Sequence, residues 1–201
     1  MSETKQRCAW CGDDPLYVHY HDTVWGWPER NSKALFAKLC LDGQQAGLSW
    51  ITILRRQSGM TEAYAGFDPV RVARFDERDV ARLLADPRVI RNRQKINSVI
   101  NNARAWCEMA ERGIDFSEFL WEFVDGRPIQ NAWRRSDQIP VTTPVAEAMS
   151  KTLKKHGFSF CGPVIVYAFM QAVGMVNDHL VSCPQHASVR AASEGSGGPR
   201  E

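Results

Sequence analysis

The sequence lacks any apolar run long enough to cross a membrane. No stretch of eighteen consecutive apolar residues occurs among its 201 residues, whereas a transmembrane helix needs about 20. The first seven residues are polar and contain no apolar segment typical of a secretory signal. We therefore expect a soluble cytoplasmic protein with no membrane partner.

The sequence also has little net charge. Its 25 Lys and Arg residues nearly balance its 23 Asp and Glu residues, which leaves a charge of +2. This excess is too small to indicate a nucleic-acid partner by itself, so any such argument must rest on where the charges lie. An apolar fraction of 44% is sufficient for a core, and the length suits one domain.

No segment alternates clearly between apolar and polar residues as a half-buried strand would, and there is no internal repeat. Apolar residues instead recur at helical spacing, which predicts an all-α fold. The cap residues Asn31 or Ser32, Asp76, Ser117 and Thr143 precede such segments. We expect helices from residues 31–32 onward, over 50–56, a short one from 68–69 onward, and over 77–85, 92–112, 118–124, 143–156, 163–173 and 177–183.

Composition divides the chain into one domain and two ends. Residues 1–7 and 184–201 are rich in small and charged residues and are predicted to be disordered. Residues 8–183 form the single predicted domain, in which 125–142 is a polar connector. Residues 8–28 carry five aromatic side chains but little periodicity, so they must pack onto the helical body.

Six cysteines occur, and in a cytoplasmic chain disulfides are the weaker expectation. Three lie in apolar segments, while Cys8, Cys11 and Cys183 lie near histidines. His179 and Cys183 are four residues apart, so on a helix both would face one side. A closed zinc site needs about two further ligands. Spacing alone does not choose among the remaining candidates Cys8, Cys11, His19, His21 and His186.

Residues 41–50 place a carboxylate, amides, glycines and a tryptophan between two predicted helices. Asp42 ends one helix, and Trp50 begins the next. Glycines such as Gly43 and Gly47 allow tight turns and close approach of a ligand. An ordinary helix–helix connection has the same features, so this segment gains a functional interpretation only from the rest of the chain.

Two segments have features of a DNA contact. Gly157 to Gly162 separate two predicted helices and follow three lysines. Free backbone N–H groups at such a hairpin and at the next helix N-terminus can bind phosphate. A second basic cluster contains Arg88, Arg91, Arg93, Lys95 and Arg104. Both segments are also compatible with solvated surface.

Several motifs together resemble the 3-methyladenine-DNA glycosylase I family of bacterial helix-hairpin-helix DNA glycosylases. They extend from residue 8 to residue 183, and their combination is specific although each is weak alone. The matching segments are 8–10, 14–17, 20–22, 25–26, 43–51, 157–162, 169–172 and 176–179.

The resemblance implies a set of sites on the chain. A structural zinc ion would clip the N- and C-terminal segments, 8–28 and 177–183, together, leaving Cys11, His19 and His186 outside. Gly47 and Leu48 would enter the duplex, and Gly157 and Gly162 would bind phosphates. The implied zinc ligands are Cys8, His21, His179 and Cys183, and the implied base pocket consists of Trp10, Tyr17, Tyr20, Trp25, Asp42 and Trp50.

Asp42 is the main departure from the family pattern. The family carries a glutamate at this position, so the charge is kept while the side chain is one methylene shorter. The resemblance implies that Asp42 recognises and helps to release the base. It implies a monomer that hydrolyses the N-glycosidic bond of 3-methyladenine in double-stranded DNA and frees the base without cutting the strand.

Two other classes of function stay open at this stage. The chain can be a zinc-stabilised binder of alkylated bases or DNA with weak or no cleavage, because Asp42 replaces the glutamate. It can also be a zinc hydrolase, although a closed site with four protein ligands disfavours this.

Overall fold

The computed structural model describes residues 6–194, and the fold is built almost entirely from helices. Eleven α-helices and four short 3-10 helices occur in this range. The α-helices are α1 Pro15–Thr23, α2 Ser32–Gln44, α3 Trp50–Leu54, α4 Gln57–Ala63, α5 Pro69–Val72, α6 Glu77–Ala85, α7 Arg93–Glu111, α8 Phe116–Trp121, α9 Pro144–Lys155, α10 Pro163–Ala172 and α11 Pro184–Glu194. The 3-10 helices are η1 Ala9–Cys11, η2 Ala65–Phe67, η3 Glu122–Val124 and η4 Ser136–Gln138.

Most helices begin where the sequence predicts a cap. The side chain of Asn31 accepts hydrogen bonds from the N–H groups of Lys33 and Ala34, and Asp76 forms a capping box at α6. Thr143 accepts from Ala146 at α9. These contacts satisfy donors that the first helical turn leaves free, so the predicted starts of α2, α6 and α9 are confirmed.

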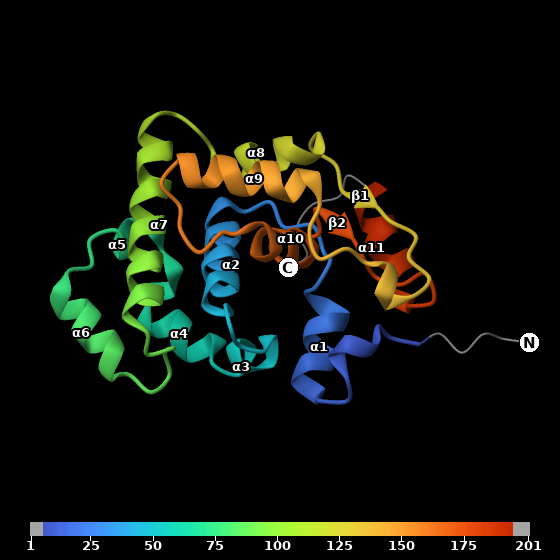
Figure 1. Cartoon of the computed structure of the whole chain (residues 1–201), viewed down its shortest axis with the longest axis horizontal. Helices are drawn as coiled ribbons and strands as arrows, with labels where there is room; N and C mark the ends of the chain where they lie inside the picture. Colours follow the sequence, from blue (N-terminus) through green and yellow to red (C-terminus); the bar gives the residue numbers. More distant parts are fainter. Residues whose placement is uncertain (1–5, 195–201) are drawn as a thin grey trace, which may run out of the picture.

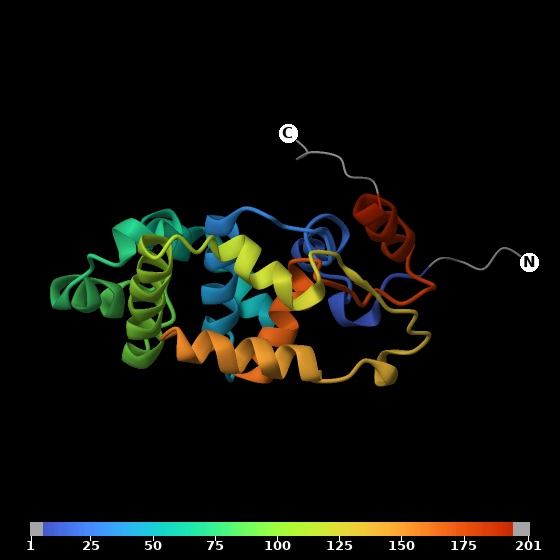
Figure 2. The same cartoon turned by 90° about the horizontal axis from the view of Figure 1, so that it is seen from above.

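Helix α2 is the centre of the core. It contacts α7, α8 and α10, while α5 and α6 pack on α7. Figure 1 shows α2 between α7 and α10, with α8 and α9 crossing one end of it. Seen from above, the molecule is elongated, with α5 and α6 at one end and α11 at the other (Figure 2). Because α2 is central, residues near its C-terminus are held rigidly.

One short strand pair joins distant parts of the chain. Strands β1 (Ile129–Gln130) and β2 (Val176–Asn177) pair in parallel. No strand was expected from the sequence, and two residues are too few to show alternation. The pair anchors the connector 125–142 beside the C-terminal segment.

The C-terminal region differs from two predictions. Residues 178–183 form turns rather than a helix, so the spacing of His179 and Cys183 is not helical spacing. Residues 184–194, expected to be disordered, form α11 instead. Helix α11 contacts β2, and its Val189 side chain is fully buried near Gly26. Residues 195–201 of the predicted disordered tail lie outside the described residues.

Of the N-terminal segment predicted to be disordered, residues 1–7, only residues 6 and 7 belong to the described part of the chain. Residues 1–5 lie outside the described range, but Arg7 forms an ion pair with Asp22 at 2.8 Å.

Within residues 6–194, no helix combines the length and apolarity that crossing a membrane requires.

Candidate active site and metal centre

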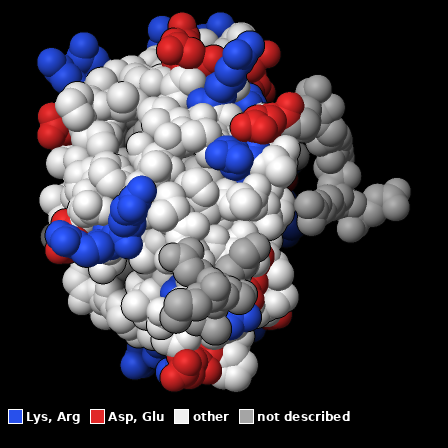
Figure 3. All heavy atoms as spheres, turned by 90° about the vertical axis from the view of Figure 1, so that its right-hand side faces the viewer, with Lys and Arg blue, Asp and Glu red and all other residues white. Residues whose placement is uncertain are grey.

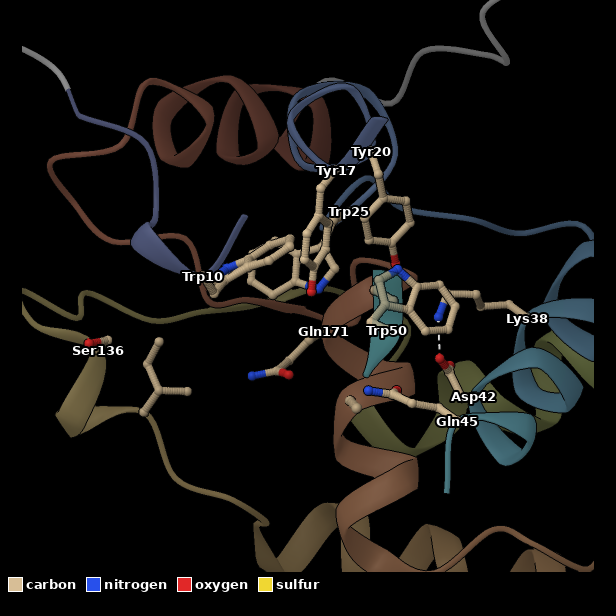
Figure 4. A pocket seen from close by; sticks show the side chains of 13 residues that line it. Trp10, Tyr17, Tyr20, Trp25, Lys38, Asp42, Gln45, Trp50, Ser136 and Gln171 are labelled. Atoms are coloured by element: carbon tan, nitrogen blue, oxygen red, sulfur yellow. Dashed lines mark hydrogen bonds and ion pairs between the residues drawn. The ribbon is translucent and has the colours of Figure 1, made fainter. Parts of the chain in front are cut away.

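A pocket of about 370 Å³ opens between the aromatic N-terminal segment and the ends of α2 and α10. Figure 4 shows its side chains converging from α1, α2, α3 and α10 and from the connector. Its volume lies in the usual range for small-molecule sites. The pocket brings together all six residues expected to bind a base: Trp10, Tyr17, Tyr20, Trp25, Asp42 and Trp50. It is also lined by Lys38, Gln45, Ser136, Ile139, Ala168, Gln171 and Ala172.

The aromatic rings that line the pocket pack against one another. The ring centroids of Trp10 and Tyr17 lie 5.1 Å apart, and those of Trp10 and Trp25 lie 5.0 Å apart. Tyr20 and Trp50 are in contact at 5.4 Å. Edge-to-face and tilted packing of this kind is favourable for aromatic pairs, and it presents π-faces to a flat ligand.

Asp42 provides a buried carboxylate with one free oxygen. Its side chain is only 3% exposed, and Oδ1 forms an ion pair with Lys38 one turn earlier on α2. Oδ2 has no hydrogen-bond partner among the described residues. Burial raises the pKa of Asp42, and the charge of Lys38 opposes that shift. A buried acceptor without a partner is costly, so Oδ2 suits a ligand that brings a donor.

Lys38 is a pocket residue that the sequence analysis missed. Its Nζ lies 4.0 Å from the centroid of the Trp50 ring, within the range of a cation–π contact. Burial lowers the pKa of Lys38, whereas Asp42 raises it. A lysine on a helix usually points to solvent; only its position four residues before Asp42 could have indicated the pair.

Gln171 is a second missed residue, and Asp178 orients it. Gln171 donates from Nε2 to Asp178 Oδ2 at 2.8 Å, and Tyr167 donates to the same oxygen at 2.7 Å. Asn131 and Trp133 donate to Asp178 Oδ1. Because its amide nitrogen is engaged, Gln171 offers its carbonyl to the pocket. A lone amide in the apolar segment 163–173 was the available signal.

The connector between α2 and α3 presents Gly47 and Leu48 to solvent. Gly47 has φ +74, a conformation that favours glycine, and Leu48 is 39% exposed. Lys95 fixes this connector, since its Nζ donates to the carbonyl oxygens of Gln44 and Ala46 at 2.8 and 2.6 Å. Gly47 and Leu48, which the family resemblance places in the duplex, therefore lie on an exposed connector that Lys95 holds.

Lys95 is not a surface residue. The prediction that it belongs to an exposed basic cluster was therefore wrong. It is 7% exposed, and three of the four arginines of the predicted cluster have partners. Arg88 pairs with Glu62 and Asp86, and Arg93 pairs with Glu77. Arg104 donates to two backbone carbonyls. The five basic residues therefore do not form one uniform cluster: Lys95 is buried, whereas Arg91 is exposed.

The hairpin between α9 and α10 exposes backbone donors. Asn102 holds it, accepting from Ser159 N–H at 2.8 Å and donating to Ser159 O at 3.1 Å. Gly157 has φ +89, so a side chain there would be strained. Gly162 caps α10 without a side chain, and a Cβ built on it meets no atom within 4 Å. Pro163, the first residue of α10, has no N–H, so the backbone donors at this helix start begin at Val164, and such donors suit an anion.

The face beside α11 carries no continuous basic patch. In Figure 3, which shows the right-hand side of Figure 1, Lys and Arg lie in separate groups, several next to acidic side chains, around a largely uncharged area. The expected DNA contacts, the hairpin and Leu48, lie on other elements. The charges seen on this face therefore do not indicate a nucleic-acid-binding surface.

Four residues from the two ends of the described chain form a candidate metal centre. The ligand atoms of Cys8, His21, His179 and Cys183 all lie within 4.8 Å of one another, and all four residues are buried. Cys183 Sγ lies 3.6 Å from His21 Nε2 and 3.7 Å from His179 Nδ1. Tetrahedral zinc with ordinary bond lengths separates sulfur and nitrogen ligands by roughly 3.6 Å. The donor set therefore fits a closed zinc site.

The outer contacts support the same fit. His21 Nδ1 bonds to Asp22 at 2.8 Å, and His179 Nε2 contacts Trp25 O at 3.1 Å. Each histidine thus turns its other nitrogen toward the cluster, as metal-binding histidines usually do. The Leu180 N–H points at Cys8 Sγ at 3.4 Å, which suits a thiolate.

The other sulfur and nitrogen candidates lie outside this cluster. Cys11 is buried, but its thiol donates to Cys8 O. His19 is next to Thr23, and His186 contacts Asn131 O at 2.8 Å. The structure therefore selects one set among those that sequence spacing left open, and it is the set that the family resemblance implies.

Comparisons with known proteins agree with this geometry. The methyladenine glycosylase family model matches residues 10–186. DNA-3-methyladenine glycosylase 1 of Escherichia coli is 49% identical over 178 residues, which cover 89% of this chain and 95% of that protein.

Solved structures match as well. A crystal structure of 3-methyladenine DNA glycosylase I is 50% identical with a TM-score of 0.88, and the match covers 89% of this chain and 98% of that one. The Staphylococcus aureus enzyme, whose structure concerns 3-methyladenine recognition, is 38% identical with a TM-score of 0.87 over 89% and 95% of the two chains. On sequence and structure alike, this chain belongs to the methyladenine glycosylase family.

Proposed function

We propose that this protein is a monofunctional DNA glycosylase that excises 3-methyladenine from alkylated double-stranded DNA in the bacterial cytoplasm. The observation that carries this proposal is the free Oδ2 of Asp42, buried in a pocket walled by aromatic rings. The relatives named above are 3-methyladenine glycosylases, and the pocket here offers a carboxylate and aromatic rings to a base.

The chemistry of the lesion matches these groups. Methylation at N3 makes the base cationic, and π-faces attract a cation by about 2 kcal/mol or more once it is desolvated. Asp42 Oδ2 accepts a hydrogen bond from the exocyclic amino group. When the C1′–N9 bond breaks, its electrons neutralise the base, which leaves uncharged, and water then adds to C1′ of the oxocarbenium sugar and loses a proton.

The pocket walls contain no free amine to form a covalent intermediate. Lys38 is the one amine among the lining residues, and its ion pair with Asp42 favours the charged ammonium. A protonated amine is not a nucleophile. We therefore propose hydrolysis alone, with no cleavage of the strand.

The base must leave the duplex to reach this pocket, at a cost of a few kcal/mol. In this proposal Leu48 fills the gap, supported by Gly47 and the Lys95 contacts to the connector. The N–H groups at Gly162 and the start of α10 bind phosphate, with Gly157 shaping the hairpin. The protein acts as a monomer, because one chain supplies all of these groups.

Cys8, His21, His179 and Cys183 would hold one zinc ion. With four protein ligands the ion supplies folding stability and no open position for a reaction. It would join the segment carrying Trp10, Tyr17 and Tyr20 to residues near the end of the domain, and so would position the aromatic wall.

Chromatography of bases released from methylated duplex DNA tests the function. We expect free 3-methyladenine to appear with intact strands. Tight binding to the DNA without release of the base would instead support the second candidate, a zinc-stabilised binder of alkylated bases. Strand cleavage would contradict the monofunctional mechanism.

A further inference from the structure

We propose that Lys38 is a specificity-determining residue, which acts with Asp42 as a paired donor and acceptor and makes the base pocket electrically neutral. This inference rests on the proposed function and assigns a role to a residue in the pocket wall. It starts from three observations: the buried ion pair, the contact of Lys38 with Trp50, and the free oxygen of Asp42.

The position of Lys38 is that of a resident cation. Its ammonium group pairs with Asp42 and lies 4.0 Å from the Trp50 centroid. A carboxylate and a π-face are the two features that should attract a cationic base. Lys38 already occupies part of both. The pocket therefore presents an incoming base with a balanced pair rather than a net negative charge.

The pair also complements one edge of adenine. The Hoogsteen edge carries an acceptor, N7, beside a donor, the exocyclic N6 amino group. A carboxylate only accepts, whereas an ammonium only donates and has three protons. One proton of Lys38 goes to Asp42 Oδ1, so others remain for N7, while the free Oδ2 accepts from N6.

Two consequences follow for selectivity. A neutral adenine-type base gains a donor from Lys38, and a cationic base is repelled by it. Removing the charge of Lys38 should therefore raise the preference for a cation. Removing its N–H donors should weaken binding of a neutral base that has N7.

The first test needs no variant. Free 3-methyladenine and its 7-deaza analogue, which replaces N7 with C–H, are titrated into the zinc-loaded protein at a pH where both are neutral. We expect the analogue to bind about tenfold more weakly, because it cannot accept from Lys38. Equal affinities would overturn the donor role of Lys38.

The second test separates charge from hydrogen bonding. Lys38→Gln removes the charge but keeps a donor, and Lys38→Met removes both at similar length. The probes are neutral 3-methyladenine and the fixed cation 3,9-dimethyladeninium. We expect the ratio of cation affinity to neutral affinity to rise at least tenfold in both variants. Only Lys38→Met should also bind neutral 3-methyladenine less tightly.

Lys38→Arg is the matched control, because it keeps the positive charge and should leave the ratio near the parent value. Circular dichroism and zinc content check that each variant is folded. An unchanged ratio in Lys38→Gln and Lys38→Met would overturn the inference. If the parent protein bound neither base, the proposed function would fail instead, so the two failures are distinguishable.

Discussion

The metal cluster and the base pocket are both buried sites built from distant segments. They differ in whether their buried polar atoms have partners within the protein. In the cluster, the ligand atoms face one another, and both outer histidine nitrogens have partners. In the pocket, Asp42 keeps a free oxygen beside exposed aromatic faces. A buried polar group without a partner is costly. The cluster is therefore suited to stabilise the fold, whereas the pocket is suited to bind a ligand that supplies the missing hydrogen-bond donor.

Breaking the cluster should have the largest effect. Cys183→Ala removes a ligand, and with it the closure of a loop from residue 8 to residue 183. By analogy with a covalent cross-link, this closure contributes on the order of 4 kcal/mol, so Tm should fall by roughly 8–16 °C. Thermal unfolding and metal analysis measure both properties together.

Cys11→Ala is the control for the cluster, because Cys11 is buried nearby but points away from the ligand atoms. It should keep a full complement of zinc. Full zinc retention in Cys183→Ala, in contrast, would refute the ligand assignment.

Removing the charge of Asp42 should have the next largest effect. We expect it to lower the affinity for 3-methyladenine rather than the stability of the fold. Asp42→Asn keeps the shape but places a donor where the base needs an acceptor. A charged hydrogen bond contributes about 1.5–3 kcal/mol, so affinity for 3-methyladenine should fall roughly tenfold to hundredfold. Calorimetric titration measures it, and an unchanged affinity would remove Asp42 from the site.

Asp42→Glu sharpens the same comparison. The family glutamate is longer, but here Lys38 holds Oδ1 and the neighbouring Gly43 packs closely on Phe160. The extra methylene should overfill the pocket and weaken 3-methyladenine binding by a few-fold. Binding as tight as in the parent would mean that water bridges the shorter Asp42 to the base.

Gly162→Leu should reduce DNA binding about tenfold through loss of a charge-assisted hydrogen bond to phosphate. Gly162→Ala is the control, since its Cβ meets open space. An equal fall in affinity for free 3-methyladenine would assign Gly162 to the pocket or to the fold.

Leu48→Ala should have a smaller effect on the enzyme than Gly162→Leu. Shortening an exposed side chain that fills the duplex gap should slow excision roughly fivefold, equivalent to about 1 kcal/mol of lost apolar contact, and leave free-base binding unchanged. Val141→Ala is the control, because Val141 is also an exposed apolar residue (74% exposed) but does not line the pocket. Equal excision rates in the Leu48 variant and the parent would exclude insertion of Leu48.

The sequence predicts elements that local chemistry determines. Asn31, Asp76 and Thr143 cap helices because their side chains reach backbone donors two or three residues ahead. One predicted cap was wrong for the same local reason: Asp115, not Ser117, caps α8, and its side chain accepts from the Glu118 N–H.

Tertiary contacts decide what the sequence could not. The helix α11 depends on Val189 packing near Gly26, and the ligand set depends on which of several cysteines and histidines the fold brings together. Lys38 and Lys95 resemble surface lysines in the sequence, yet both are held by buried oxygens. The family resemblance implied the aromatic residues of the pocket, but its motifs did not include Lys38.

The most direct test of the comparison is a crystal structure of the protein with 3-methyladenine bound. If the free oxygen of Asp42 waits for the base, Oδ2 should accept from the exocyclic N6 at about 2.7–3.2 Å, while the zinc cluster keeps its four ligands unchanged. A base stacked on the rings with Oδ2 still unpartnered would contradict the account.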